Sequence, residues 1–268
     1  MAAQEGWNPG IHDAQTFFEA DPAGFVGVSV ENDLIGGGAI VRHNEKFGFM
    51  GLFLVAPEHR GQGIGRKLWY ARRNLLLDRL APGASIGMDG VSAMVDFYRE
   101  GGFVPQYISS RFQTEAAPNL SVHDPNVTPT GEDDFESVRE FDGRCFPGER
   151  VGYLLAWLRQ PDVHQYVYRR EDGKIGGFGT LRPCLLGWKI GPLFAETPDI
   201  ARSLIGVLIS AVNGEQVSID VPSTNPVAQE LCRSLGMSEV FQCTRMYFGP
   251  KPVYQASLIY GLTSFELG

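Results

Sequence analysis

The residues best suited to chemistry lie in a glycine-rich turn at residues 60–65, which reads Arg-Gly-Gln-Gly-Ile-Gly. Residues 49–55 before it are apolar, as in a buried strand, and after Gly65 apolar residues recur at helical spacing. The turn is therefore predicted to open a helix, where the first backbone N–H groups have no intrahelical partner and the helix dipole is positive. Glycine lacks the Cβ atom that would keep a ligand away from these amides. The turn is thus predicted to bind a diphosphate group.

Two common phosphate-binding patterns do not fit this turn. A P-loop requires Lys followed by Ser or Thr after its last glycine, whereas Gly65 is followed by Arg66, Lys67 and Leu68. The dinucleotide fingerprint G-x-G-x-x-G fails as well, because the glycines of this turn alternate strictly. Residues 59–79 carry six Lys or Arg side chains against one Asp, in a chain of net charge −8. This local basicity favours a small polyanion, because nucleic-acid binding would require a basic surface across a domain.

Two segments together resemble a known family. The pattern Arg60-x-x-Gly63-x-Gly65, directly after a strand ending in Val-Ala-Pro-Glu, resembles the acetyl-CoA pyrophosphate motif of the GNAT N-acetyltransferase superfamily. Residues 93–103 resemble the A-x-x-x-F-Y-x-x-x-G-F segment of the same family. The resemblance implies transfer of an acetyl group from acetyl-CoA to a primary amine. Direct attack in a ternary complex is expected, since no cysteine lies near the turn to form an acyl-enzyme.

The resemblance also implies roles for individual residues. Tyr98 is expected to be the general acid that protonates the thiolate leaving group. A backbone N–H of the strand before the turn is expected to stabilise the thioester oxygen, and pantetheine is expected to pair with this strand where it diverges from residues 84–88. The residues expected to contact the cofactor are Phe53, Leu54, Val55, Arg60, Gly61, Gln62, Gly63, Ile64, Gly65 and Arg66.

The general base and the acceptor site are less sharply indicated. Asp89, at the end of a predicted strand beside the cleft, is one possible base, and His43 and Glu45 lie on a hairpin that could reach it. Candidates for binding the acceptor are Glu45, Asp142 and Asp220. For the candidate bases an ordinary solvated residue, and for Asp220 a turn former at the end of a strand, is the simpler interpretation.

An internal repeat organises the chain. Residues 35–42 align with 175–182 at an offset of 140, whereas residues 97–103 align with 231–237 at an offset of 134. The second copy has therefore lost six positions, most simply at the glycine turn, and it carries Cys232 where the first copy has Tyr98. The second copy is predicted to have lost catalysis.

The alternation of elements predicts an α/β fold with two tandem GNAT-like domains, each a mixed central sheet flanked by helices. The expected boundaries are 1–115 for the catalytic domain, 116–126 for a linker and 127–268 for the degenerate domain. The first copy is expected to lack its first strand. Either residues upstream or another segment, such as the tail at 260–268, would have to cover the resulting sheet edge.

Composition limits the remaining classes. The chain is 43% hydrophobic and 20% charged, lacks an apolar run of the ~20 residues that span a membrane, and has no signal pattern, so we expect a cytoplasmic protein. The four cysteines form no C-x-x-C pair, so free, buried thiols and no metal are expected. The expected partner is a small-molecule amine, without nucleic acid or membrane, for a monomer or homodimer. A non-catalytic CoA-binding sensor and acetylation of a protein amine remain open alternatives.

Overall fold

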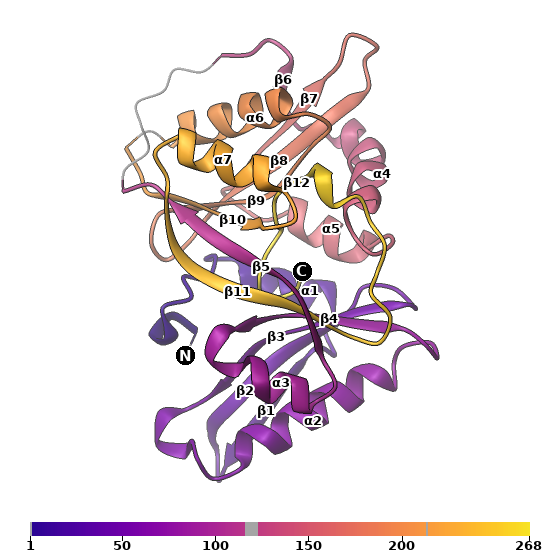
Figure 1. Cartoon of the computed structure of the whole chain (residues 1–268), viewed down its shortest axis with the longest axis vertical. Coiled ribbons are helices and arrows are strands. Elements are labelled where there is room, and N and C mark those ends of the chain that lie inside the picture. The colour runs from indigo at the N-terminus through magenta and orange to yellow at the C-terminus, as the bar shows by residue number, and fades with distance from the viewer. Residues whose placement is uncertain (1, 116–122, 213) are drawn as a thin grey trace.

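The computed structural model describes residues 2–115, 123–212 and 214–268, and these residues fold into alternating helices and strands, as predicted (Figure 1). The elements of the first half are α1 (Asp13–Ala20), β1 (Phe25–Val30), β2 (Asp33–Arg42), β3 (Phe47–Val55), α2 (Ile64–Leu77), β4 (Ser85–Val91), α3 (Val95–Glu100) and β5 (Val104–Gln113). Those of the second half are β6 (Val127–Pro129), α4 (Phe135–Cys145), α5 (Val151–Leu158), β7 (His164–Arg169), β8 (Ile175–Pro183), β9 (Trp188–Ala195), α6 (Pro198–Ser210), β10 (Val217–Pro222), α7 (Pro226–Ser234), β11 (Ser238–Phe248) and β12 (Ile259–Gly261). Short 3₁₀ helices lie at Ala2–Glu5, Pro57–His59, Ser92–Met94, Glu132–Asp134 and Ala256–Leu258.

The same order of elements occurs twice, which confirms the internal repeat. From α1 to β5 the first half matches α5 to β11 of the second half, element by element. The short strand β6 and helix α4 have no counterpart among the described elements of the first half. The expectation that the first copy lacks its first strand therefore agrees with the structure, and β1 lies at one end of the strand order.

The strands of both halves join in one mixed sheet. Among the described strands the order is β1-β2-β3-β4-β11-β5-β10-β9-β8-β7-β6, with β12 paired to β9. Strand β11 of the second half lies between β4 and β5 of the first, and β5 in turn pairs with β10. Each half thus contributes its last long strand to the region where the two halves meet. Figure 1 shows β5 and β11 crossing side by side between the two halves.

Two buried ion pairs involve β5 and β11, the two strands that each pair with a strand of the other half. Arg111 on β5 donates to both carboxylate oxygens of Asp220 on β10 at 2.7 and 2.8 Å, and Arg245 on β11 binds Asp89 on β4 at 2.8 and 2.7 Å. In both cases the two residues are direct register partners. An unpaired charge at such a buried position would be strongly destabilising, so each pair disfavours a shift of strand register.

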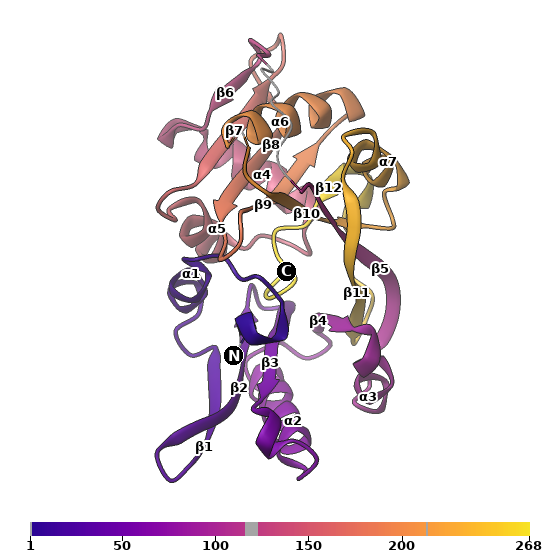
Figure 2. The same ribbon diagram turned by 90° about the vertical axis from the view of Figure 1, so that its left-hand side faces the viewer.

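The structure tests the expectation for the tail but not the one for the linker. Residues 116–122 of the predicted linker lie outside the described residues, and the domain boundaries on either side of it stay a prediction. One alternative was that the tail at 260–268 covers the sheet edge at β1. This is wrong, because the tail begins in β12, which pairs antiparallel with β9. It then runs back between the two halves, where the C-terminus lies in both views (Figures 1 and 2).

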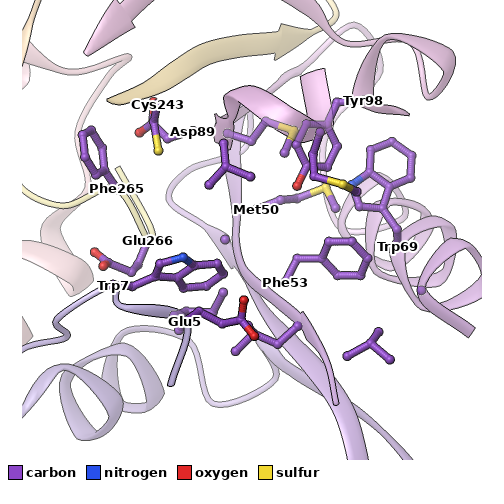
Figure 3. A pocket seen from close by; sticks show the side chains of 18 of the residues that line it. Glu5, Trp7, Met50, Phe53, Trp69, Asp89, Tyr98, Cys243, Phe265 and Glu266 are labelled. Atoms are coloured by element: carbon purple, nitrogen blue, oxygen red, sulfur yellow. The ribbon is translucent and has the colours of Figure 1, made fainter. Parts of the chain in front are cut away.

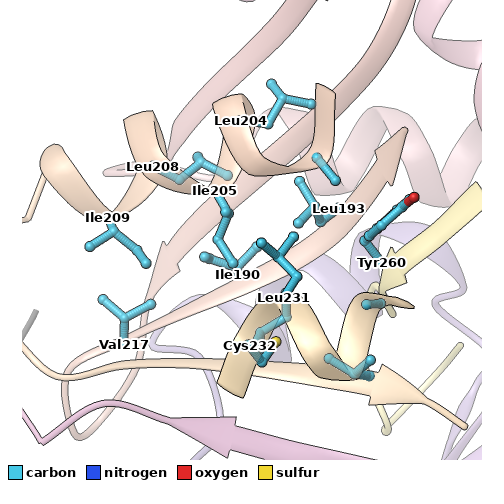
Figure 4. Packing of buried hydrophobic residues seen from close by; sticks show 14 of the residues in the cluster. Ile190, Leu193, Leu204, Ile205, Leu208, Ile209, Val217, Leu231, Cys232 and Tyr260 are labelled. Carbon is cyan, nitrogen blue, oxygen red and sulfur yellow. The ribbon is translucent and has the colours of Figure 1, made fainter. Parts of the chain in front are cut away.

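Apolar packing of helices on the sheet explains the stability of the second half. Thr197 caps α6 by accepting a hydrogen bond from the Ile200 amide, and Pro198 occupies the first turn. Leu204 and Leu208, four residues apart on α6, then face the sheet. Figure 4 shows this helix face packed against residues of β9, β10 and α7. In the first half α2 packs in the same way on β2 and β3.

Among the described helices, none combines the length and apolarity needed to cross a membrane.

Candidate active site

The glycine turn lies between β3 and α2, as predicted. Gly61 and Gly63 have φ angles of 76° and 78°, a left-handed conformation that side chains rarely adopt, and no atom lies within 4 Å of where their Cβ atoms would be. Gly63 is the N-cap of α2, whose first helical residue is Ile64. The unpaired amides of the first helical turn are therefore next to open space, which is the geometry that binds an anion.

A cavity of about 490 Å³ begins at this turn and runs along β3 into the space between the two halves. Of the predicted site residues, those that line it are Phe53, Leu54, Val55, Arg60, Gly61, Gly63, Gly65, Arg66, Asp89 and Tyr98. Gln62 and Ile64 belong to the same turn but do not line the cavity. Figure 3 shows Tyr98 and Trp69 on one side of the cavity and Trp7, Phe265 and Glu266 on the other.

Strand β3 diverges from its neighbour beside the cavity, as predicted. Parallel pairing with β4 stops at Phe49 and Gly87. Two residues later the ladder with β2 is interrupted between Gly37 and Ala39, and Leu52 has a φ of 51°. An interruption of this kind is a β-bulge, which turns backbone groups away from the ladder. No described strand pairs with residues 51–55 on the side that faces the cavity, although the carbonyl oxygen of Val55 accepts a hydrogen bond from Nε of Arg60 at 2.8 Å.

Arg72 on α2 supports this bulge from behind. Its guanidinium donates to the carbonyl oxygens of Ala39, at 2.5 Å, and of Gly51. The side chain is 0% exposed, and its Nε and Nη1 atoms have no partner among the described residues. Burial lowers the pKa of Arg72 to about 10, which leaves it charged at neutral pH. The sequence pattern counted Arg72 as part of a basic, anion-binding surface, whereas it serves the fold of β3.

Tyr98 is placed with its hydroxyl toward the cavity. The side chain is 5% exposed, and its ring stacks on Trp69 at a centroid distance of 6.1 Å. A Cβ atom on Gly90 would come within 2.7 Å of the tyrosine ring, so this glycine is needed for the ring to lie where it does. Burial raises the pKa of Tyr98 to about 12, with the charge of Arg72 opposing the shift. The phenol is therefore neutral, and able to donate a proton, throughout the neutral pH range.

The predicted acidic residues separate into two groups. Asp89 lines the cavity, and burial raises its pKa while Arg245 opposes that shift, but both its oxygens are bound by Arg245. Asp220 reaches the site only through Arg111, which does line the cavity. Glu45 is exposed on its hairpin and does not line the cavity.

Asp142 and His43 lie in the packing around the tail instead. Asp142 is buried and accepts two hydrogen bonds from Arg150, at 2.9 and 2.8 Å, and Arg150 also binds the carbonyl oxygen of Gly268. His43 contacts the carbonyl oxygen of Leu267 through Nε2. The structure therefore does not bring Glu45, Asp142 or His43 to the cavity.

Several cavity residues were missed because they come from the two ends of the chain. Glu5 and Trp7 precede α1, while Phe265 and Glu266 belong to the tail. No motif connects these segments to the glycine turn. The one sequence signal was the tail itself, which has no counterpart in the repeat.

In the second half, the chain itself fills the place that corresponds to the cavity. Strand β9 is paired in parallel with β10 only from Trp188 to Ile190, so it diverges just as β3 does. Strand β12 fills that gap, with Ile259 opposite Phe194 and Gly261 opposite Leu193. At the repeat offset of 140 these β9 residues correspond to Leu54 and Phe53 of β3. The chain itself occupies the place where, in the first half, the cavity is open.

Neither the thiols nor the acids of this structure form a metal site. All four cysteines are buried, as predicted. Within the described ranges, no group of three or more His, Cys, Asp or Glu side chains could hold a metal ion.

Comparison with known proteins agrees with this architecture. An acetyltransferase (GNAT) family profile matches residues 2–103, and an acetyltransferase (GNAT) domain profile matches residues 138–261. The whole chain is 30% identical to the holothin acyltransferase of a Pseudoalteromonas strain, over 89% of that protein's length. The chain belongs to the GNAT acyltransferase family. The predicted tandem GNAT organisation is therefore confirmed. Membership of the family and the similarity to an acyltransferase support acyltransferase activity.

Further similar proteins and structures agree with the GNAT assignment. An uncharacterised N-acetyltransferase of Bacillus subtilis, YitH, is 25% identical over 82% of the chain and 76% of its own length. A proposed acetyltransferase from Pyrococcus horikoshii superimposes with a TM-score of 0.82 at 23% identity, over 96% of this chain and 84% of that one. A tandem GNAT protein from the clavulanic acid biosynthesis pathway has a TM-score of 0.62 at 14% identity, over 93% and 92%. These two structures support the fold alone.

Proposed function

We propose that this protein transfers an acetyl group from acetyl-CoA to the primary amine of a small molecule. The observation that carries the proposal is the single cavity that joins the glycine turn, the free edge of β3, Tyr98 and an apolar end between the two halves. Diphosphate, pantetheine, thioester and amine would lie along it in that order.

The residues present fit coenzyme A. The unpaired amides at the start of α2 would bind the diphosphate, with Gly61 and Gly63 leaving room for it. The free edge of β3 at residues 51–55 would pair with the amides of pantetheine. The match between this edge and the β12-filled edge of β9 supports that placement, because β12 shows that an extended chain fits such a gap.

Direct attack of the amine accounts for the remaining groups. The amine nitrogen forms a bond to the thioester carbon, and a backbone N–H of the bulged strand stabilises the negative charge that develops on the oxygen. The carbon–sulfur bond then breaks, and the sulfur takes the proton of the Tyr98 hydroxyl. The buried cysteines argue against an acyl-enzyme, since burial raises the pKa of Cys243, the cysteine that lines the cavity, and so suppresses its thiolate.

The test is thiol release from acetyl-CoA across a panel of primary amines, with mass spectrometry of the N-acetyl product. Gly63→Glu should abolish binding of CoA, since it places a side chain on a left-handed residue and a negative charge at the phosphate site. Gly173→Glu is the matched control, because Gly173 also has a φ of 79° and open space around it but lies on the β7–β8 hairpin. It should bind and turn over normally.

Two results would contradict the proposal. A folded protein that shows no heat of binding with CoA in calorimetry would exclude the donor. Tight binding of acetyl-CoA without any N-acetyl product would instead favour the CoA-binding sensor. Because the 30%-identical relative is named an acyltransferase, propionyl-CoA and longer acyl-CoA thioesters belong in the same panel.

A further inference from the structure

The end of the cavity opposite the glycine turn has an aromatic wall and a single unpaired acid. Its wall includes Trp7 from the N-terminal segment and Phe265 from the tail (Figure 3). Phe241 of β11 also lines the cavity, and its ring centroid lies 6.2 Å from that of Phe265. Glu266, the next residue of the tail, also lines it.

Three carboxylates line the cavity within the described residues, and two of them are already bound. Asp89 holds Arg245 through both oxygens, and Glu5 is paired with Arg60. Glu266 is 6% exposed, its Oε2 atom is buried without a hydrogen-bond partner, and it forms no ion pair with a described residue. The Oε2 atom has therefore lost water without gaining a partner in the protein, which makes it a candidate to bind a cation that enters the cavity.

The position of Glu266 is fixed by the tail around it. Its backbone carbonyl packs against Gly51 of the β3 bulge so closely that a Cβ atom there would lie 1.6 Å from the oxygen. On one side Leu267 is held by His43, and on the other Arg150 binds Thr263 at 2.7 Å. The carboxylate is thus anchored beside the segment of β3 along which the thioester would lie.

Three cationic side chains lie near Glu266, and each is already held by another group. Arg111 and Arg182 are each committed to an aspartate, and Lys189 donates to the carbonyl oxygen of Asn8 at 3.0 Å. They lie near enough for Glu266 to influence their pKa values but do not bind its carboxylate.

Resting on the function proposed above, we propose that Glu266 binds the ammonium group of the acceptor and removes its first proton. We further infer that the acceptor carries a flat aromatic group, held by Trp7, Phe241 and Phe265. Glu266 passes its proton to solvent. The second proton leaves the nitrogen after the carbon–nitrogen bond has formed, and it passes through solvent to the Tyr98 phenolate, which restores the hydroxyl that gave its proton to sulfur.

The experiment uses the full chain saturated with CoA, with 2-phenylethylamine as the probe and 2-phenylethanol as its uncharged counterpart. Calorimetry should show that the wild type prefers the amine, and that Glu266→Gln weakens amine binding by about tenfold to hundredfold, as expected for the loss of a charged partner. Binding of the alcohol and of CoA should be unchanged. Glu140→Gln, which removes an exposed carboxylate on α4, is the matched control and should behave as wild type.

Kinetics separate the role of Glu266 from the activity itself. In thiol release with 2-phenylethylamine, Glu266→Gln should raise KM for the amine and lower kcat, whereas Glu266→Asp should recover part of both. Product formation by the wild type that is insensitive to Glu266→Gln would overturn the inference and leave the proposed function intact. If Glu266→Gln does not fold, the wild type decides alone: equal affinity for amine and alcohol, or no binding of either, would overturn it.

Discussion

Acidification is expected to destabilise the protein through His43. The Nε2 atom of this ring lies 2.8 Å from the carbonyl oxygen of Leu267, and because a carbonyl only accepts, the neutral ring carries its proton on Nε2. The Nδ1 atom is buried without a partner. A second proton would therefore create a buried charge with no acceptor. Burial in the first place, and then the charge of Arg150, lower the pKa of His43 to about 3.

The size of the effect follows from this pKa and that of the unfolded chain, about 6.5. Below pH 6.5 the unfolded state binds a proton at His43 that the folded state does not, so stability is fully present above pH 6.5 and is lost as the pH falls toward 3. At about 1.4 kcal/mol per pH unit, the loss is roughly 2 kcal/mol at pH 5. Because His43 holds Leu267, the tail that carries Glu266 should be the first segment to loosen.

The assay is urea unfolding, followed by fluorescence, at pH 8 and pH 5. The wild type should lose about 2 kcal/mol more than His43→Gln between the two pH values, since the variant lacks the titrating group. His123→Gln removes an exposed histidine and should follow the wild type. The reasoning is refuted if His43→Gln and the wild type show the same pH dependence, or if the His43 ring titrates near pH 6.5 in the folded protein by NMR.

Two further predictions concern catalysis and cofactor binding. Tyr98→Phe should lower kcat by about 10²–10⁴-fold and leave the affinity for acetyl-CoA unchanged, because the acid is lost while the ring still packs on Trp69. Steady-state kinetics would measure kcat, and calorimetry would measure the affinity. A fall in affinity parallel to the fall in kcat would contradict this role. Each chain should bind one CoA, since β12 fills the groove beside β9 in the second half, and a native mass spectrum with two CoA molecules per chain would exclude that explanation.

The predictions that agree with the structure were made from local sequence patterns. The glycine turn, the helix after it and the Phe97–Tyr98 segment each depend on residues close together in sequence, where spacing reports directly on backbone geometry. The repeat was visible for the same reason. Arg111 and Arg245 are equivalent at the same offset of 134 residues, but the alignment contains no information on which aspartate each would bind.

The interpretations that needed contacts between distant segments were incomplete. Arg72 was counted with the basic residues of 59–79 that favour an anion, yet it is buried behind the bulge of β3. Asp142 was a candidate for the acceptor, but it binds Arg150 beneath the tail. Glu266 and Trp7 were not considered, since each is more than 30 residues from the nearest motif in this chain.

By itself the amino-acid sequence determined the repeated α/β order and the glycine turn before α2, because these are properties of hydrophobic period and of glycine conformation over short distances. The resemblance to the family indicated Tyr98. Only the tertiary structure decided that β5 and β11 exchange between the halves, that β12 closes the second groove, and that the two chain ends complete the cavity. Strand pairing and the burial of a charge depend on partners far away in the chain, and both are settled only when the segments pack together.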